Sequence, residues 1–168
     1  LEVVSGIEEA RLISLGVIHA LPILSEKALI IDIGGGSTET IITENNELLH
    51  LQSNKLGAIR LTKKYFDGVP SNETSIAKCK KFIKGEWAQT LDTIENVGFA
   101  TTVGTSGTLT TLITIAHLGK NSELPTVLNG LTVKAKHVLN VIRDIKNAST
   151  PEKIAPLNGM DITRTDII

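Results

Sequence analysis

The sequence predicts an α/β domain in which three hairpin-linked strands are followed by alternating helices and strands. Residues 28–33 form an apolar run broken by one acid, which is typical of a strand covered on both faces. Residues 38–43 are rich in β-branched side chains, and residues 48–53 follow a polar turn at 44–47. These segments predict an antiparallel meander that is opened by a glycine-rich loop.

Helices are predicted both before and after this meander in the sequence. Residues 1–4 are expected to end a strand. Ser5 is a suitable N-cap with Glu8 three residues later, so we expect a helix that ends near Ala20. The remaining expected elements are helices at 59–66, 76–94, 108–118 and 138–145, strands at 99–103 and 127–133, and a short helix after Thr150-Pro151.

The composition narrows the classes of function. Hydrophobic residues make up 41% of the 168 residues, enough for a core, and the net charge of -1 argues against a nucleic-acid partner. Cys79 is the only cysteine, so neither an internal disulfide nor a cysteine metal cluster is expected. Neither an apolar run of about 20 residues nor a signal-peptide pattern is visible. We therefore predict a cytoplasmic protein without a membrane partner.

The most informative segment is the loop Asp32-Ile33-Gly34-Gly35-Gly36-Ser37-Thr38-Glu39. Glycines allow backbone N–H groups to surround an anion closely, and the two hydroxyls add donors. The flanking acids would repel phosphate, unless a divalent cation bridges them to it or one acid handles an attacking water. The pattern is neither a Walker P-loop nor a Rossmann fingerprint, because Glu39 stands where the last glycine would be. The structural alternative is a tight hairpin turn that needs glycine.

Five segments in order resemble the exopolyphosphatase and guanosine pentaphosphate phosphohydrolase family. They are 5–12 (Ser-Gly-Ile-Glu-Glu-Ala-Arg-Leu), the loop 32–39, 56–61 (Leu-Gly-Ala-Ile-Arg-Leu), 103–108 (Val-Gly-Thr-Ser-Gly-Thr) and 164–168, where Thr165 replaces the family's alanine. The resemblance implies one lobe of the ribonuclease-H/actin-like fold, in the superfamily of sugar kinases, Hsp70 and actin. It implies that residues 1–20 connect the lobes, that 21–168 form a second lobe incomplete at its C-terminus, and that the N-terminal lobe is absent.

The resemblance also implies a role for each matching residue. Glu9 matches the family's catalytic glutamate, which activates the attacking water; without the resemblance it is an ordinary first-turn helix acid. Asp32 and Glu39 match acids that support Mg²⁺ or that water. The expected phosphate-binding residues are Gly34, Gly35, Gly36, Ser37 and Thr38 on one side of a cleft and Gly104, Ser106 and Gly107 on the other.

The predicted function is therefore a Mg²⁺-dependent phosphoanhydride hydrolase acting on polyphosphate or guanosine pentaphosphate. Two alternatives stay open, an actin-like ATPase or kinase lobe and a non-catalytic phosphate-binding regulatory module. The four histidines are scattered without ligand spacing, and we expect the lysines of residues 78–84 to form a solvated helix face. The sequence leaves open which substrate is preferred and whether the parent protein is a homodimer.

Overall fold

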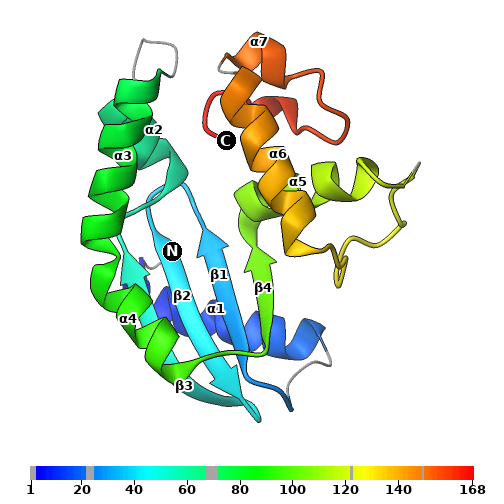
Figure 1. Cartoon of the computed structure of the whole chain (residues 1–168). Coiled ribbons are helices and arrows are strands. Elements are labelled where there is room, and N and C mark those ends of the chain that lie inside the picture. Colours follow the sequence, from blue (N-terminus) through cyan, green and yellow to red (C-terminus); the bar gives the residue numbers. More distant parts are fainter. Residues whose placement is uncertain (1–2, 22–24, 67–71, 122, 149) are drawn as a thin grey trace.

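A computed structural model describes residues 3–21, 25–66, 72–121, 123–148 and 150–168. The elements follow the order shown in Figure 1: α1 (Gly6–Ala20), β1 (Ala28–Ile33), β2 (Thr38–Glu44), β3 (Glu47–Asn54), α2 (Ala58–Tyr65), α3 (Glu73–Glu86), α4 (Ala88–Val97), β4 (Thr101–Thr105), α5 (Ser106–Leu118), α6 (Ala135–Ala148), α7 (Pro151–Ile154) and a 3-10 turn at Ile162–Arg164.

The strands within the described residues form one mixed sheet in the order β3-β2-β1-β4. The pairs β1–β2 and β2–β3 are antiparallel, which confirms the predicted meander, and β4 pairs with β1 in parallel. Asn45 and Asn46 turn the chain between β2 and β3 with φ of 51° and 66°, values that asparagine tolerates well. Since β1 and β4 run in parallel, both end at the edge of the sheet from which the predicted phosphate loops start.

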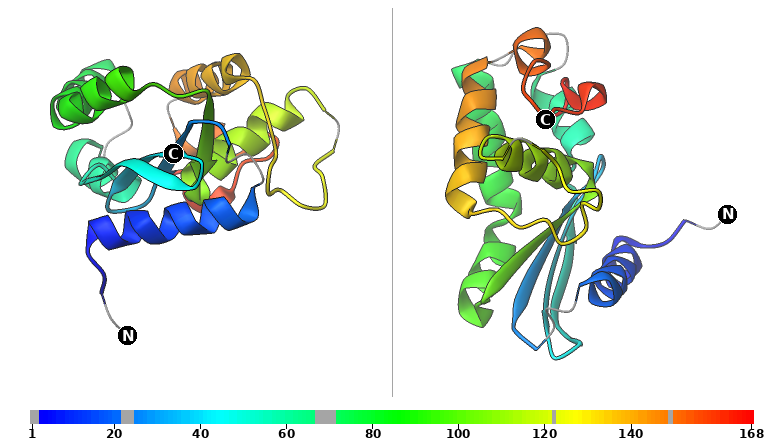
Figure 2. Two further views of the ribbon diagram at one scale, coloured as in Figure 1. Left: turned by 90° about the horizontal axis from the view of Figure 1, so that it is seen from below. Right: turned by 90° about the vertical axis from the view of Figure 1, so that its right-hand side faces the viewer.

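Helices cover both faces of this sheet (Figure 2). Helix α1 lies on one face, and α3, α4 and α6 lie on the other. The alternation of side chains along β1 and β2 separates the two core clusters, because Ile30 and Ile41 pack towards α1 whereas Leu29 and Ile42 pack towards α4. Each fully buried side chain of this size stabilises the fold by about 1.5–3 kcal/mol. A third cluster joins α5 and α6 through Leu112, Ile115, Ala116 and Val141.

Three predicted elements differ from the structure. The helix expected over 76–94 is interrupted at Trp87, whose φ of -104° and ψ of 1° separate α3 from α4. Residues 127–133 form no strand, and the sheet of the described residues consists of β1 to β4. Val3 and Val4 lie outside any strand, and residues 1–2 fall outside the described part of the chain. Apolar patterning identified the buried sides, but it could not place a helix break or supply a neighbouring strand.

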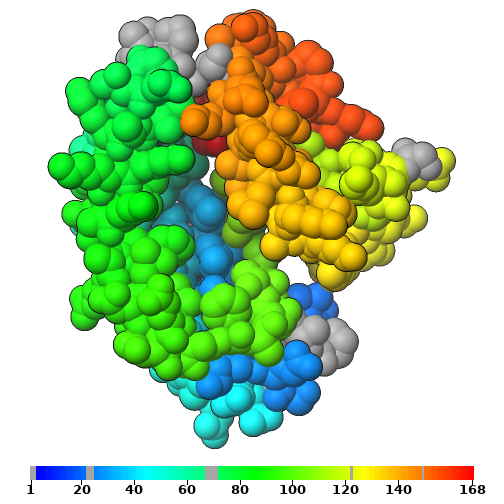
Figure 3. All heavy atoms as spheres, in the orientation of Figure 1, coloured from blue at the N-terminus to red at the C-terminus, as the bar shows by residue number. Residues whose placement is uncertain are grey.

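On the face opposite α1, the surface is hollowed between α3 and α6, with atoms of β1 at the bottom of the hollow (Figure 3). None of the helices in the described residues is long and apolar enough to cross a membrane.

Candidate functional site

Four polar residues form a row across the sheet, one from each strand. Register pairs Ser53 with Glu39, Glu39 with Asp32, and Asp32 with Thr105. The Ser53 hydroxyl donates to Glu39 Oε1 at 2.7 Å, and the Thr105 hydroxyl donates to Asp32 Oδ2 at 2.5 Å. The two acids are almost completely buried, with exposures of 1% for Glu39 and 8% for Asp32. Each carboxylate is thus fixed through one of its oxygens by a hydroxyl from the outer strand.

The two acids of this row face each other without a basic partner. Residues directly opposite in an antiparallel pair have Cβ atoms about 4.5–5.5 Å apart, where like charges repel. The ion pairs found among the described residues are Glu8–Arg11 and Asp161–Arg164, and neither involves the row. Burying two adjacent carboxylates without a counter-charge is costly, so this arrangement favours a bound cation.

Glu9 on α1 is close enough to both acids for their charges to act on it. Partial desolvation by the neighbouring protein raises the pKa of Glu9, although the residue as a whole is exposed, and the negative charges of Glu39 and Asp32 raise this pKa further. The first turn of α1 is capped by the Ser5 hydroxyl, which accepts the Glu8 N–H at 3.2 Å, as the sequence predicted. The Glu8 carboxylate itself pairs with Arg11 at 2.7 Å instead of returning to the cap.

The start of α1 lies directly on β3. A Cβ built on Gly6 would come within 2.5 Å of Ser53 Oγ, so only glycine allows this approach. Glu9 follows three residues later on the same helix, while Ser53 holds Glu39. The contact between Gly6 and Ser53 therefore helps to fix Glu9 relative to the acidic row.

The glycine loop (residues 34–38) is folded against the start of α2. Its turn is closed by the Gly34 N–H, which donates to Ser37 O at 3.0 Å. The Ala58 N–H donates to Gly34 O at 2.9 Å and the Arg60 N–H donates to Gly35 O at 3.1 Å. The Arg60 Nε donates to Gly36 O at 2.8 Å.

Glycine is required around this loop for close packing. Gly57, the N-cap of α2, lies on the peptide between Gly35 and Gly36 so tightly that a Cβ would overlap its backbone atoms. A Cβ on Gly35 would come within 2.9 Å of Ile59 Cδ1, whereas a Cβ on Gly36 would meet no atom within 4 Å. The described glycines with positive φ are Gly98, Gly130 and Gly159, none of them in the loop.

The second predicted loop, around residues 104–107, adjoins the acidic row at Thr105. Gly104 packs against Leu109, because a Cβ built on the glycine would lie 3.1 Å from Leu109 Cβ. Ser106 adopts a φ of 65°, which is uncommon for a residue with a side chain. The guanidinium of Arg164 covers Gly107. Arg164 Nε also lies 3.5 Å from Asp161 Oδ2. This loop therefore borders Asp32, with an arginine over its glycine.

The structure thus places Asp32, Glu39 and the starts of both predicted loops at one end of the sheet, with Glu9 on α1 close to the two acids. It also adds residues that the sequence analysis missed. Ser53 and Thr105 were missed because a hydroxyl becomes informative only when register places it opposite an acid. Within the described residues, no group of three or more histidine, cysteine or acidic side chains has the geometry of a metal site. The two row acids are the buried carboxylates that could contribute to a metal site here.

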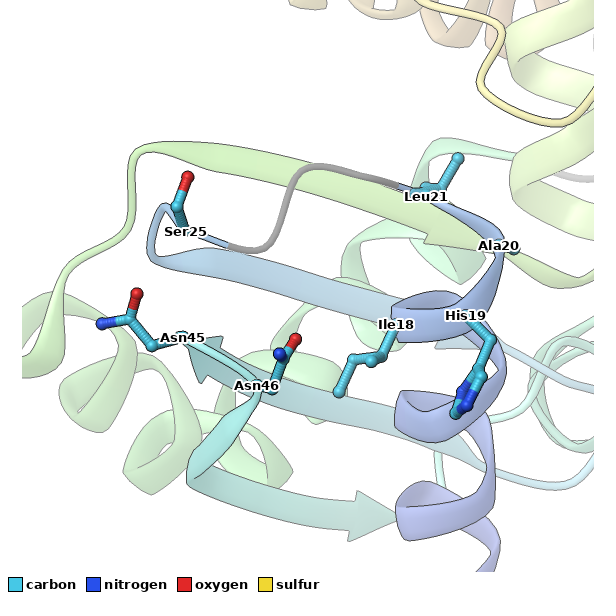
Figure 4. Close-up of a pocket in the computed structure, with 7 residues that line it drawn as sticks. All are labelled: Ile18, His19, Ala20, Leu21, Ser25, Asn45 and Asn46. Atoms are coloured by element: carbon cyan, nitrogen blue, oxygen red, sulfur yellow. The ribbon is translucent and has the colours of Figure 1, made fainter.

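Another hollow lies away from the acidic row. It has a volume of about 590 Å³ and lies at the opposite end of the sheet, between the end of α1 and the β2–β3 turn (Figure 4). Its lining includes His19, Asn45 and Asn46, and the His19 ring is hydrogen-bonded at Nδ1 to Leu15 O at 2.7 Å. A second hollow of about 350 Å³ is lined by Gly107, Asp161 and Arg164, among other residues.

The fold defines an actin-like lobe with a glycine loop and acids at one end of its sheet, and comparison with known proteins agrees with this fold. The whole chain, residues 1–168, matches the Ppx/GppA phosphatase family, and it belongs to that family. Over 115 residues, 68% of this chain, it is 30% identical to exopolyphosphatase 2 of Mycobacterium tuberculosis. Over 112 residues, 67% of this chain, it is 35% identical to the guanosine-5'-triphosphate,3'-diphosphate pyrophosphatase of Vibrio atlanticus.

Solved structures agree with the fold. An exopolyphosphatase from Cytophaga hutchinsonii has a TM-score of 0.82 and 28% identity over 99% of this chain and 53% of its own. The Ppx/GppA family member of Aquifex aeolicus has a TM-score of 0.78 at 21% identity, over 99% of this chain and 52% of its own. The chain spans about half the length of these structures, 36% of the Mycobacterium relative and 22% of the Vibrio relative.

Proposed function

We propose that the protein containing this chain hydrolyses the terminal phosphoanhydride bond of inorganic polyphosphate or of guanosine pentaphosphate. The observation that carries this proposal is Glu9, an exposed carboxylate with a raised pKa, which lies close to the two buried acids that flank the glycine loop. Perturbed acids of this kind are typical of sites where protons are moved. The relatives named above as an exopolyphosphatase and as a guanosine pentaphosphate pyrophosphatase support both substrate types.

In the proposed reaction, the glycine loop holds the terminal phosphate through backbone N–H groups. Glu9 accepts a proton from a water molecule while the water oxygen forms a bond to the terminal phosphorus. The bond from that phosphorus to the bridging oxygen breaks, and the bridging oxygen leaves with the electron pair. Positioning and charge neutralisation do most of the work in such a transfer, and a placed base contributes about 10²–10⁴-fold.

Asp32 and Glu39 are the proposed Mg²⁺ ligands. Each carboxylate has one oxygen bound by a hydroxyl, and its other oxygen has no hydrogen-bond partner among the described residues. Hard oxygen ligands, of which one or two are carboxylates, together with substrate phosphates are the usual Mg²⁺ environment. When bound, Mg²⁺ would neutralise phosphate oxygens beside the acids.

Steady-state kinetics of the full-length protein test the proposal. Phosphate release should be measured from polyphosphate, guanosine pentaphosphate and ATP in the presence of Mg²⁺. Preference for either of the first two supports the proposal; preference for ATP supports an actin-like ATPase, and binding without turnover supports a regulatory module. Asp32→Asn should raise the Mg²⁺ concentration needed for half-maximal rate, and an unchanged Mg²⁺ titration would contradict the metal assignment.

A further inference from the structure

We propose that Arg60 and the first turn of α2 are positioning elements that aim the N–H groups of the glycine loop at the bound phosphate. This inference deepens the proposed function and rests on it for the identity of the anion. Its basis is that α2 binds three consecutive carbonyl groups of the loop, those of Gly34, Gly35 and Gly36.

The planarity of the peptide bond links these carbonyls to the donors of the loop. In a trans peptide the C=O of one residue and the N–H of the next point in opposite directions. Because the three carbonyls point to α2, the N–H groups of Gly35, Gly36 and Ser37 point away from it. None of these N–H groups has a hydrogen-bond partner in the part of the chain that the structure describes. They therefore form a set of free donors on a common side, the arrangement that binds anions.

Helix α2 is suited to this task because its first N–H groups have no partner within the helix. Its N-cap is Gly57, which supplies no side-chain cap, and the loop carbonyls take the place of that cap for Ala58 and Arg60. The absence of a side chain on Gly57 also lets the helix lie flat on the Gly35–Gly36 peptide. The start of α2 therefore fixes the conformation of the loop by binding its carbonyl groups, and the N–H groups of the loop stay free for the ligand.

Arg60 is distinctive because it holds two adjacent peptides. Its backbone N–H fixes Gly35 O, and its side chain fixes Gly36 O at 2.8 Å. Of the three loop carbonyls, that of Gly36 is thus the one held by a side chain. Because it belongs to the same peptide as the Ser37 N–H, it sets the direction of that N–H. Arg60 is exposed and forms no ion pair with a described residue, so a direct charge effect on the phosphate is the competing explanation.

Two substitutions separate the donor from the charge. Arg60→Gln keeps an N–H donor at the same number of bonds from Cα as Nε and removes the charge. Arg60→Lys keeps the charge but places a methylene where Nε was. If the hydrogen bond to Gly36 matters, the glutamine variant should bind phosphate nearly as the parent does, and the lysine variant should bind it more weakly.

The measurement is calorimetric binding of methylenediphosphonate, a diphosphate analogue that phosphoanhydride hydrolases do not cleave, to the full-length protein in Mg²⁺. Arg60→Lys and Arg60→Met should raise Kd by about 10-fold or more, because a hydrogen bond to a charged group is lost or misdirected. Arg60→Gln should stay within about threefold of the parent, and so should the matched control Lys63→Met on the exposed side of α2. In hydrolysis assays, Arg60→Lys and Arg60→Met should raise KM with kcat little changed, which is the pattern of lost ground-state binding.

The opposite ranking, with glutamine weak and lysine near the parent, would overturn the inference and assign Arg60 to direct charge neutralisation. Equal affinity in all variants would overturn it too. If the methionine variant does not fold, the glutamine and lysine pair still decides. A parent that binds methylenediphosphonate but releases phosphate from none of the substrates would refute the proposed function, while the ranking of the Arg60 variants would still test this inference.

Discussion

Thr105→Val tests whether the hydroxyl that holds Asp32 stabilises the acidic row. Valine has nearly the shape of threonine, so the change removes the hydrogen bond of 2.5 Å to Asp32 Oδ2 without opening a cavity. Asp32 is only 8% exposed, so water replaces the lost donor poorly. A hydrogen bond to a charged group contributes about 1.5–3 kcal/mol, and we expect the free energy of unfolding to fall by about this amount.

The assay is thermal unfolding of the full-length protein, followed by circular dichroism at neutral pH. The midpoint should fall by about 2–4 °C for each kcal/mol in a domain of this size. Thr102→Val is the matched control, because Thr102 lies exposed in the same strand and its hydroxyl makes no hydrogen bond to a described residue. Thr105→Ser keeps the donor and should recover most of the loss. If Thr105→Val is no less stable than Thr102→Val, the reasoning about the row is refuted.

Four further substitutions test the rest of the site. Glu9→Gln should lower kcat by about 10²–10⁴-fold with folding intact, since the amide cannot accept a proton; turnover within a few-fold of the parent would remove Glu9 from catalysis. Glu39→Gln deletes one of the charges that raise the pKa of Glu9, so the Glu9 carboxyl should titrate at lower pH in an NMR titration, and an unmoved titration would contradict the proximity of the two acids. Gly57→Ala should lower the free energy of unfolding by about 1–3 kcal/mol through overpacking. Gly36→Ala has open space around its Cβ, so it should leave stability unchanged and weaken binding of methylenediphosphonate. Equal stability of the two variants would contradict the tight packing at Gly57.

Local patterns were enough to predict the meander. The apolar run at 28–33, the β-branched run at 38–43 and the asparagine turn each encode their conformation in neighbouring residues, and the structure confirms all of them. The expected strand at 127–133 was wrong for the converse reason. A strand is completed by hydrogen bonds to another strand, which β-propensity cannot supply.

The break at Trp87 shows a similar limit. Helices α3 and α4 both bury one side, with Cys79 in the first and Ile94 in the second, so their apolar positions continue across the break at helical spacing. Periodicity therefore predicted one helix, whereas the structure has two helices that meet at Trp87.

The sequence by itself determined the chemical groups of this site: the acids at 9, 32 and 39, the glycines at 34–36 and the order of the motifs, because residue identity and short spacing are local properties. Only the tertiary structure decided how these groups work on one another. Strand register placed Ser53 and Thr105 against the acids, and desolvation together with the proximity of Glu39 and Asp32 raised the pKa of Glu9. Helix α2 turned the loop carbonyls towards itself and left the N–H groups free. Hydrogen-bond direction and electrostatic coupling depend on distances between segments far apart in the chain, and those distances are fixed only when the sheet and its helices pack together.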